Sequence, residues 1–388
     1  MNVLVAMDSF KGSLSSMEAG NAVKEGIKRV YPDADVLVCQ VADGGEGTVH
    51  ALAAGLGGSP VTVRVTGPLG DPVNCEYILI KDRKTAVIEM AGAAGLILVP
   101  KEKRNPMHTT TYGVGEVIMD AIRRGCRRFI IGIGGSATND GGAGMLQALG
   151  IHFFKRDGTE IARGAEGLKD LVKIDIKDMP PVLRDCKFQI ACDVANPLCG
   201  MNGCSFVFAP GKGARAADII AMDEWLKKYS ELAKEVNLFA DRDKRGAGAA
   251  GGMGFAFQTF LRGKLVSGAD LIMKGSGLEG KIQAADLVIT GEGRLDSQTL
   301  SGKVPIGIAG LAKKYDKPVI ALAGSIGGGA EECLERGILA YFPVVRGICT
   351  EAEAMEAEAA KRNLADTAEQ VFRILWLGKN EEKGTEGT

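Results

Sequence analysis

Short apolar runs alternate with amphipathic stretches near both ends of the chain. Residues 3–7 predict a strand, and apolar residues then recur at helical spacing over residues 19–30. Ser15 and Glu18 have the spacing of a capping box, so we expect this helix to begin just after Ser15. A second strand is expected over residues 35–41 and a second helix over residues 49–58. Such alternation is typical of a parallel sheet with helices packed on it.

From Val61 the pattern changes to consecutive strands joined by turns. The stretch VTVRVTGPLGDPVNCEYILIKDRKTAVIEMA contains turn signals but no helical spacing. Alternation of strands and helices returns near Asp286. We therefore expect an α/β protein with one doubly wound domain built from residues 1–60 and 285–378. Residues 61–284 would form an inserted α/β domain, and the polar residues 379–388 a disordered tail.

Composition and charge narrow the function classes. A length of 388 residues fits two domains, and the high glycine count of 54 fits many tight strand-to-helix turns. A net charge of -1 argues against a nucleic-acid partner. The N-terminus lacks the pattern of a signal peptide, and no run reaches the roughly 18 apolar residues of a membrane helix. We expect a cytoplasmic protein without a membrane partner.

The cysteines and histidines argue against a structural zinc site. The nine cysteines are scattered without a C-x-x-C pair, and there are only three histidines. Reduced thiols in the cytoplasm are the simplest interpretation of these cysteines.

Several predicted strands end in an acidic residue: Asp8, Asp43, Asp193 and Glu292. Ligands of open parallel sheets bind outside the carboxyl ends of the strands, so these carboxylates could share one site. Each alone could equally be a helix cap or a turn residue. Basic residues occur in similar loops, at Lys11, Arg294 and Lys303. This mixture of residue types suits a ligand that combines a metal ion with a phosphate.

A glycine-rich loop, GGSATNDGGAG at residues 134–144, follows the apolar run 129–133 and precedes a predicted helix. A strand, a glycine loop and a helix can form a phosphate cradle. Residues 132–137 (GIGGSA) also fit the dinucleotide fingerprint, with Glu160 as the ribose-binding acid. A tight turn without a ligand would explain the glycines. It would not explain four polar side chains in the same loop: Ser136, Thr138, Asn139 and Asp140.

Taken together, these segments resemble the type I glycerate kinase family. The matching motifs run in family order along nearly the whole chain: DSFKGSLS, VADGGEGT, TGPLG, IEMA, GIGGSATNDGGAGMLQALG, CDVANPL, GAAGGMGF and DLVITGEGRLDSQTLSGKVP. The resemblance implies a flavodoxin-like domain made of both chain ends, with a second α/β domain inserted. It also implies phosphorylation of D-glycerate by ATP with Mg²⁺, most often to 2-phosphoglycerate. An NAD-dependent dehydrogenase of a small hydroxy acid is the alternative, and a non-enzymatic nucleotide-binding module is a third.

The resemblance and the strand-end acids together suggest roles for particular residues. Asp193 is expected to be the catalytic base, with Asp43 and Asp296 as alternatives. Lys11, Arg294 and Lys303 would hold the glycerate carboxylate or the γ-phosphate. The candidate Mg²⁺ ligands are Asp8, Glu292 and Asp296. Further substrate- or phosphate-binding candidates are Ser9, Ser13, Asp43, Gly44, Gly45, Gly134, Gly135, Ser136, Thr138, Asn139, Asp140, Asn196 and Ser325.

Some properties stay open at this stage. The motif FAPGKGA has Gly211 where the family commonly has Gln, which leaves the role of Lys212 open. The residues do not distinguish 2- from 3-phosphoglycerate as the product, nor do they show which domain binds ATP. Glycerate and ATP are the expected small-molecule partners, and the protein could be a monomer or a homodimer.

Overall fold

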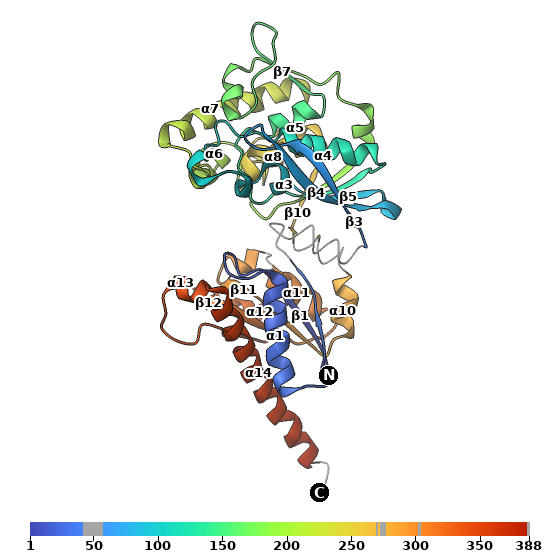
Figure 1. The fold of residues 1–388 in the computed structure, drawn as a ribbon, viewed down its shortest axis with the longest axis vertical. Coiled ribbons are helices and arrows are strands. Elements are labelled where there is room, and N and C mark those ends of the chain that lie inside the picture. Colours follow the sequence, from blue (N-terminus) through green and yellow to red (C-terminus); the bar gives the residue numbers. More distant parts are fainter. Residues whose placement is uncertain (42–56, 269–270, 272–276, 302–303, 386–388) are drawn as a thin grey trace. The chain divides into compact units, whose positions relative to one another are not determined.

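The computed structural model describes residues 1–41, 57–268, 271, 277–301 and 304–385 (Figure 1). These residues fall into two compact units. The terminal unit combines residues 1–41 with the described residues from 271 onward, and the central unit is formed by residues 57–268. The expected second helix and the candidates Asp43, Gly44, Gly45 and Lys303 lie outside the described residues.

The terminal unit contains a five-stranded parallel sheet. Its spatial order is β13-β12-β11-β1-β2, which in chain order is the 2-1-3-4-5 arrangement of flavodoxin-like folds. The expected flavodoxin-like fold is therefore confirmed. The strand order reverses between β1 and β11, so the topological switch point lies there. The strands are β1 (Asn2–Met7), β2 (Asp35–Val38), β11 (Leu287–Leu295), β12 (Val319–Ile326) and β13 (Ala340–Pro343).

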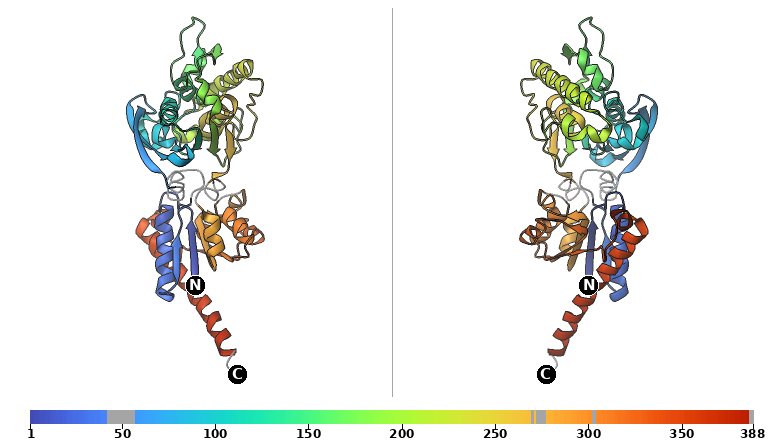
Figure 2. Two further views of the ribbon diagram at one scale, coloured as in Figure 1. Left: turned by 90° about the vertical axis from the view of Figure 1, so that its right-hand side faces the viewer. Right: turned by 90° about the vertical axis from the view of Figure 1, so that its left-hand side faces the viewer.

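Helices from both ends of the chain pack side by side in this unit. The capping box predicted for Ser15 and Glu18 is present, and helix α1 (Ser16–Val30) begins directly after it. Helix α14 (Ala357–Thr385) lies along α1 in all views (Figures 1 and 2). The remaining helices of the unit are α10 (Leu278–Ala284), α11 (Val304–Lys313), α12 (Glu332–Glu335) and α13 (Glu351–Met355).

Two element boundaries differ from the sequence predictions. Helix α10 packs against α11 and β1, so it belongs to the terminal unit although the predicted domain boundary followed it. The helix expected over residues 350–377 is interrupted at Glu356, whose carboxylate accepts from the main-chain nitrogens of Glu358 and Ala359 and caps α14. Helix α14 continues to Thr385 where a disordered tail was expected, because good helix formers (Leu, Lys, Glu) dominate residues 377–383.

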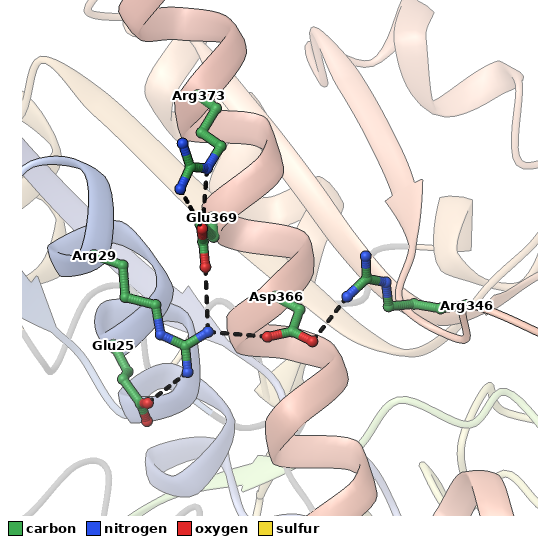
Figure 3. A network of polar contacts seen from close by, with 6 residues as sticks. All are labelled: Glu25, Arg29, Arg346, Asp366, Glu369 and Arg373. Atoms are coloured by element: carbon green, nitrogen blue, oxygen red, sulfur yellow. Dashed lines mark hydrogen bonds and ion pairs between the residues drawn. The ribbon is translucent and has the colours of Figure 1, made fainter.

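A network of charged side chains joins α1 to α14 (Figure 3). Arg29 of α1 donates to Asp366 Oδ1 at 2.9 Å and to Glu369 Oε2 at 3.3 Å, and it also pairs with Glu25 at 2.7 Å. Arg346 donates to the second oxygen of Asp366 at 2.8 Å. Exposed ion pairs contribute little individually, so the buried apolar face between the two helices carries most of the stability. The network adds specificity to the packing of α1 on α14.

The central unit contains a six-stranded mixed sheet in the order β10-β9-β6-β5-β4-β3. The first three strands in sequence pair antiparallel, as the pattern from Val61 predicted, and the other pairs are parallel. The strands are β3 (Ser59–Thr66), β4 (Pro72–Ile80), β5 (Thr85–Glu89), β6 (Arg128–Gly132), β9 (Lys187–Ala191) and β10 (Lys264–Val266). Strands β7 (His152–Phe154) and β8 (Lys173–Asp175) form a separate antiparallel pair.

Helices of the central unit bury one continuous core with this sheet. Ile88, Ile131 and Ile190 of three neighbouring strands are fully buried, as are Tyr229 and Phe255 of two helices. The helices are α3 (Ala91–Ala94), α4 (Tyr112–Arg123), α5 (Ala143–Ala148), α6 (Cys204–Phe208), α7 (Ala216–Val236) and α8 (Ala249–Phe260). Short 3-10 helices are η1 (Lys81–Arg83), η2 (Leu96–Leu98), η3 (Lys101–Lys103), η4 (Ala165–Asp170), η5 (Pro181–Asp185), η6 (Pro210–Lys212) and, in the terminal unit, η7 (Thr299–Ser301). Of the helices in the described residues, none has the length and apolar character needed to cross a membrane.

Candidate active site

Two predicted metal ligands occupy neighbouring strand ends in the terminal unit. Met7 of β1 pairs with Gly291 of β11, and the main-chain nitrogen of Asp8 donates to the Gly291 carbonyl at 2.8 Å. Asp8 and Glu292 therefore stand at adjacent positions across the topological switch point. Both residues are buried, with 3% and 6% exposure. Ligands of doubly wound sheets bind at this place in the fold.

A buried threonine links Glu292 to Asp296. Thr299 Oγ1 donates to Glu292 Oε1 at 2.7 Å and accepts from the main-chain nitrogen of Asp296 at 3.1 Å. The Asp296 carboxylate accepts from Arg294 Nε at 3.1 Å and from the main-chain nitrogen of Gln298 at 2.9 Å. Thr299 was not among the residues predicted from the sequence. Its position three residues after an Asp in a polar loop was the available signal, because such spacing favours side chain to main chain hydrogen bonds.

The predicted anion-binding residues of the terminal unit lie along the same loops. Ser9, Lys11 and Ser13 follow β1, and Lys11 is exposed. Arg294 is exposed and pairs in register with Ser325 of β12. A guanidinium and a hydroxyl at one level of neighbouring strands can together bind an anionic oxygen.

The acidic candidates do not form a complete protein-made metal site. In the part of the chain that the structure describes, no group of three or more His, Cys, Asp or Glu side chains could hold a metal ion. The predicted trio of Asp8, Glu292 and Asp296 is therefore not gathered as a three-residue site in the described residues, and the Asp296 carboxylate accepts from Arg294. Mg²⁺ is commonly held by one or two carboxylates together with substrate phosphates, and Asp8 with Glu292 suit that arrangement.

In the central unit, the glycine-rich loop after β6 is held by Asp140. Its carboxylate is fully buried and accepts from the nitrogen and hydroxyl of Thr111 at 2.9 and 2.8 Å, and from the nitrogens of Gly142 and Gly144 at 3.0 and 3.3 Å. Burial raises the pKa of Asp140, and these hydrogen bonds oppose that rise. Asp140 therefore fixes the start of α5.

Two other polar residues of this loop also point inward. Asn139 is fully buried and donates to Ser205 Oγ at 2.9 Å, and Thr138 is fully buried. Thr138, Asn139 and Asp140 were predicted from the sequence to bind a ligand. All three side chains are buried, Asp140 and the amide nitrogen of Asn139 bond within the protein, and the three residues stay proposed as substrate-binding residues. Main-chain nitrogens of the loop are partly occupied as well, since Ala137 donates to Ala94.

The buried ammonium of Lys212 contacts the first half of the loop. Its Nζ donates to Ser136 Oγ and to the Thr138 carbonyl, each at 2.7 Å. Burial lowers the pKa of Lys212 to about 8, and the nearby Cys204 and Asp140 partly oppose this change. The sequence left Lys212 without a role because its partners lie more than 70 residues away along the chain.

A glycine-rich segment braces the loops after β6 and β9. Ala250, Gly251 and Gly252 have left-handed φ angles of 53°, 67° and 96° inside α8. The carbonyl of Gly251 accepts from the nitrogen of Gly141 at 2.9 Å, and the nitrogen of Gly248 donates to the Asn196 carbonyl at 2.9 Å. The motif GAAGGMGF therefore joins the two loops through main-chain contacts, and at Gly248 and Gly251 an added Cβ would stand 2.1 Å from a carbonyl oxygen of these loops.

Asp193 stands at the carboxyl end of β9, beside the strand that leads into the glycine-rich loop. Gly132 of β6 pairs with Ala191 of β9, so both loops leave the sheet at one edge. Asp193 is exposed, and its Oδ1 accepts from the main-chain nitrogen of Gly268 at 3.2 Å. Asn196 donates to the Asn202 carbonyl at 2.8 Å, which directs its amide into its own loop.

Comparison with known proteins identifies the family. A model of the glycerate kinase family matches residues 3–376. The chain belongs to the glycerate kinase family. This match includes the strand ends that carry the candidate residues in both units, and it confirms the resemblance seen in the sequence motifs.

Other members of the glycerate kinase family are similar over nearly their full length. A glycerate kinase of Halalkalibacterium halodurans is 48% identical over 373 residues, which cover 94% of this chain and 97% of that protein. A glycerate 2-kinase of Escherichia coli is 48% identical over 372 residues, covering 95% and 98%. A crystal structure from Salmonella typhimurium LT2, described as glycerate kinase 2, matches with a TM-score of 0.84 and 46% identity over 98% of this chain and 99% of that one.

Membership of the glycerate kinase family makes the chain an enzyme, a kinase, and the dehydrogenase alternative is not supported. The structure gives the physical reason. A dinucleotide fingerprint opens directly into a helix, whereas here α5 begins at Ala143, six residues after GIGGSA ends at Ala137. Glu160, the supposed ribose ligand, bonds to His152 and Gln147 beside the separate β7–β8 pair.

Proposed function

We propose that this member of the glycerate kinase family transfers the γ-phosphoryl group of ATP to D-glycerate and forms 2-phosphoglycerate. The family match over residues 3–376 supports the reaction class most strongly. The choice of the 2-hydroxyl follows the E. coli relative, which is named a glycerate 2-kinase. The geometry agrees with phosphoryl transfer, which requires positioning, neutralisation of phosphate charge and a base for the attacking hydroxyl.

Asp193 is the proposed base. It is an exposed carboxylate at a strand end, and the hydrogen bond from the Gly268 nitrogen fixes one of its oxygens. A base must reach the hydroxyl proton of the substrate, and exposure at a strand edge permits that contact. Asp296, whose carboxylate accepts from Arg294, is an alternative candidate. Asp43 also remains a candidate for this role.

Asp8 and Glu292 are the residues proposed to hold Mg²⁺ with the nucleotide. When bound, the ion would neutralise charge on the phosphate oxygens. The donor chemistry fits, because two carboxylates stand at adjacent strand ends and Mg²⁺ prefers oxygen ligands. Thr299 orients Glu292 through the hydrogen bond between its hydroxyl and Oε1.

Cationic and hydroxyl groups at the strand edges are proposed to hold the anionic groups of the substrates. In the terminal unit these are Lys11, Arg294 and Ser325, together with Ser9 and Ser13. In the central unit Ser136 is the polar side chain of the glycine-rich loop that retains 7% exposure. Gly134 and Gly135, which precede Ser136, are proposed to let the main chain approach the same anionic group. Asn196, Gly44, Gly45 and Lys303 remain proposed as substrate-binding residues from the sequence motifs.

The proposed reaction is tested by glycerate-dependent release of ADP. Pyruvate kinase and lactate dehydrogenase would report ADP from purified protein supplied with ATP, Mg²⁺ and D-glycerate. Absence of ADP release would refute the reaction. For regiochemistry, adding enolase without phosphoglycerate mutase should produce phosphoenolpyruvate. A strict requirement for the mutase would show that the product is 3-phosphoglycerate.

We further propose a cytoplasmic protein that acts as a monomer or homodimer. All nine cysteines are free thiols, and most are buried, which suits a reducing compartment. Cell fractionation tests the location, and sedimentation equilibrium tests the assembly state.

A further inference from the structure

Lys212 carries a buried positive charge that is not part of an ion pair with any described residue; the Asp140 carboxyl acts on it only at longer range. The residue has 7% exposure, and its Nζ donates to a hydroxyl and a carbonyl, both neutral acceptors. Among the residues that the structure describes, no carboxylate lies within ion-pair distance of this ammonium. Burying a charge without a counter-charge is costly, so such a group is seldom retained for stability alone.

The contact with Lys212 determines the direction of the hydrogen bond at Ser136. An ammonium has three donors and no acceptor, so Ser136 Oγ must accept from Lys212 Nζ at 2.7 Å. The hydroxyl hydrogen of Ser136 is then available for a different partner. Within the described ranges, no acceptor for that hydrogen is found. The Ser136 hydroxyl is therefore held as a donor toward any further partner. Its 7% exposure allows contact with a small ligand.

The loop has several supports besides Lys212. Asp140 bonds to Thr111 and holds the start of α5, and Gly141 bonds to Gly251 on the other side. Thr109 Oγ1 donates to the Ala137 carbonyl at 2.8 Å. None of these contacts involves Lys212, so the loop has a scaffold to which the buried charge is an addition.

We propose that Lys212 is a positioning residue, whose ammonium holds Ser136 as a hydrogen-bond donor to an anionic oxygen of a substrate bound at the glycine-rich loop. The inference rests on the proposed phosphoryl transfer, because that reaction brings a carboxylate and phosphates to the protein. Either group offers the required anionic oxygen. Separate measurements with glycerate and with ATP distinguish the two sources.

The charge state of Lys212 provides a readout that a purely structural role would not affect. Burial lowers the pKa of Lys212 to about 8. The groups that face it are the Cys204 thiol on α6, whose burial raises its pKa to about 12, and the Asp140 carboxyl in the loop. Above its pKa, the neutral amine can accept from Ser136, which reverses the hydrogen bond. The donor orientation is therefore complete below that pKa and is lost as the pH rises through it.

The experiment compares Lys212→Met, Lys212→Arg and Ser136→Ala with wild type. Lys228→Met is the matched control, because Lys228 is exposed on α7. We expect Lys212→Met to lower kcat/KM for one substrate by roughly 10- to 100-fold, the effect of losing a hydrogen bond to a charged group. Ser136→Ala should lower it similarly, and the double variant should be little worse than either single one, since the two residues act as a unit.

The pH profile and the binding of each substrate complete the test. Wild-type kcat/KM should fall above about pH 8, whereas Lys212→Arg should keep its activity at alkaline pH because arginine stays charged. Full activity of Lys212→Met, additive losses in the double variant, or an unchanged alkaline fall in Lys212→Arg would each overturn the proposal. Calorimetric titration with glycerate and with ATP tests the Lys212–Ser136 pair without turnover. Weaker binding of one substrate by Ser136→Ala would support the pair even if the proposed reaction itself failed.

Discussion

Gly251 lies directly against the carbonyl of Thr138, so closely that a Cβ atom at position 251 would stand 2.1 Å from that oxygen. Gly251 also has a left-handed φ angle of 67°. Both facts require glycine at this position, since other residues would clash and would strain the main chain. The glycine-rich loop after β6 thus owes its position to the segment of α8 that packs on it.

Gly251→Ala is expected to destabilise the protein by more than about 1 kcal/mol, because alanine disfavours positive φ and has no space here. Activity should fall together with the melting temperature. Gly280→Ala is the control, since a Cβ there meets nothing within 4 Å and lies on the surface of α10. Thermal unfolding of both variants measures the difference. Equal melting temperatures would show that the close contact with Thr138 has been overestimated.

Asp193→Asn should lower kcat by about 10²- to 10⁴-fold, the usual contribution of a general base. The amide preserves the shape of the side chain and can still accept the hydrogen bond from the Gly268 nitrogen. We therefore expect the melting temperature and the KM for ATP to change little. Steady-state kinetics with saturating ATP measures the effect. A variant with near-normal kcat would transfer the role of base to Asp296 or Asp43.

Thr299→Val should raise the Mg²⁺ concentration needed for half-maximal activity several-fold. The valine removes the donor that orients Glu292 Oε1, and a hydrogen bond to a charged group contributes roughly 1.5–3 kcal/mol. Thr299→Ser keeps the hydroxyl and serves as the matched control. Activity titrated with Mg²⁺ in the presence of a chelator distinguishes the variants. Identical metal dependence in all three proteins would argue against Glu292 as a Mg²⁺ ligand.

The contribution of His152 to stability should depend on pH. Its ring bonds to Glu160 through Nδ1 and to Asp178 through Nε2 at 3.1 Å, and these carboxylates raise its pKa. A raised folded-state pKa means that this stabilisation is complete below the unfolded value near 6.5 and is lost as the pH rises through the folded value.

His152→Gln should therefore lower the melting temperature at about pH 5.5 and have little effect at about pH 9. Melting curves of both proteins across this range measure the difference. Kinetic constants serve as the control, because His152 lies on β7, in the separate β7–β8 pair, and is not among the proposed catalytic residues. A difference in melting temperature that is constant with pH would contradict the assigned ion pairs.

Local sequence signals predicted the fold well. The capping box of Ser15 and Glu18, with contacts inside one helical turn, formed as expected. The flavodoxin-like arrangement also followed from the repeated strand–helix pattern and the family motifs. Such patterns encode which face of an element is buried, and strand order then follows from chain connectivity.

The side chains of the candidate site were harder to assign. Asp140 was predicted to bind a ligand, but the orientation of its carboxylate depends on a hydrogen bond from Thr111, which lies 29 residues away in the sequence. Lys212 could not be recognised because its partner Ser136 is 76 residues distant. A sequence pattern shows that a polar residue is present. Whether its side chain bonds to other protein groups or faces a ligand depends on its burial in the folded protein.

The pairing of α1 with α14 determines the order in which the protein can fold during synthesis. Strand β1 leaves the ribosome first, yet its neighbour β11 begins only at Leu287 and its covering helix α14 only at Ala357. Helix α1 can pack on β1 and β2 at once, but its side that faces α14 stays uncovered while the whole central unit is translated. The central unit is continuous, so its sheet has all its strands by Val266. A chaperone that shields nascent chains would find a target on this side of α1.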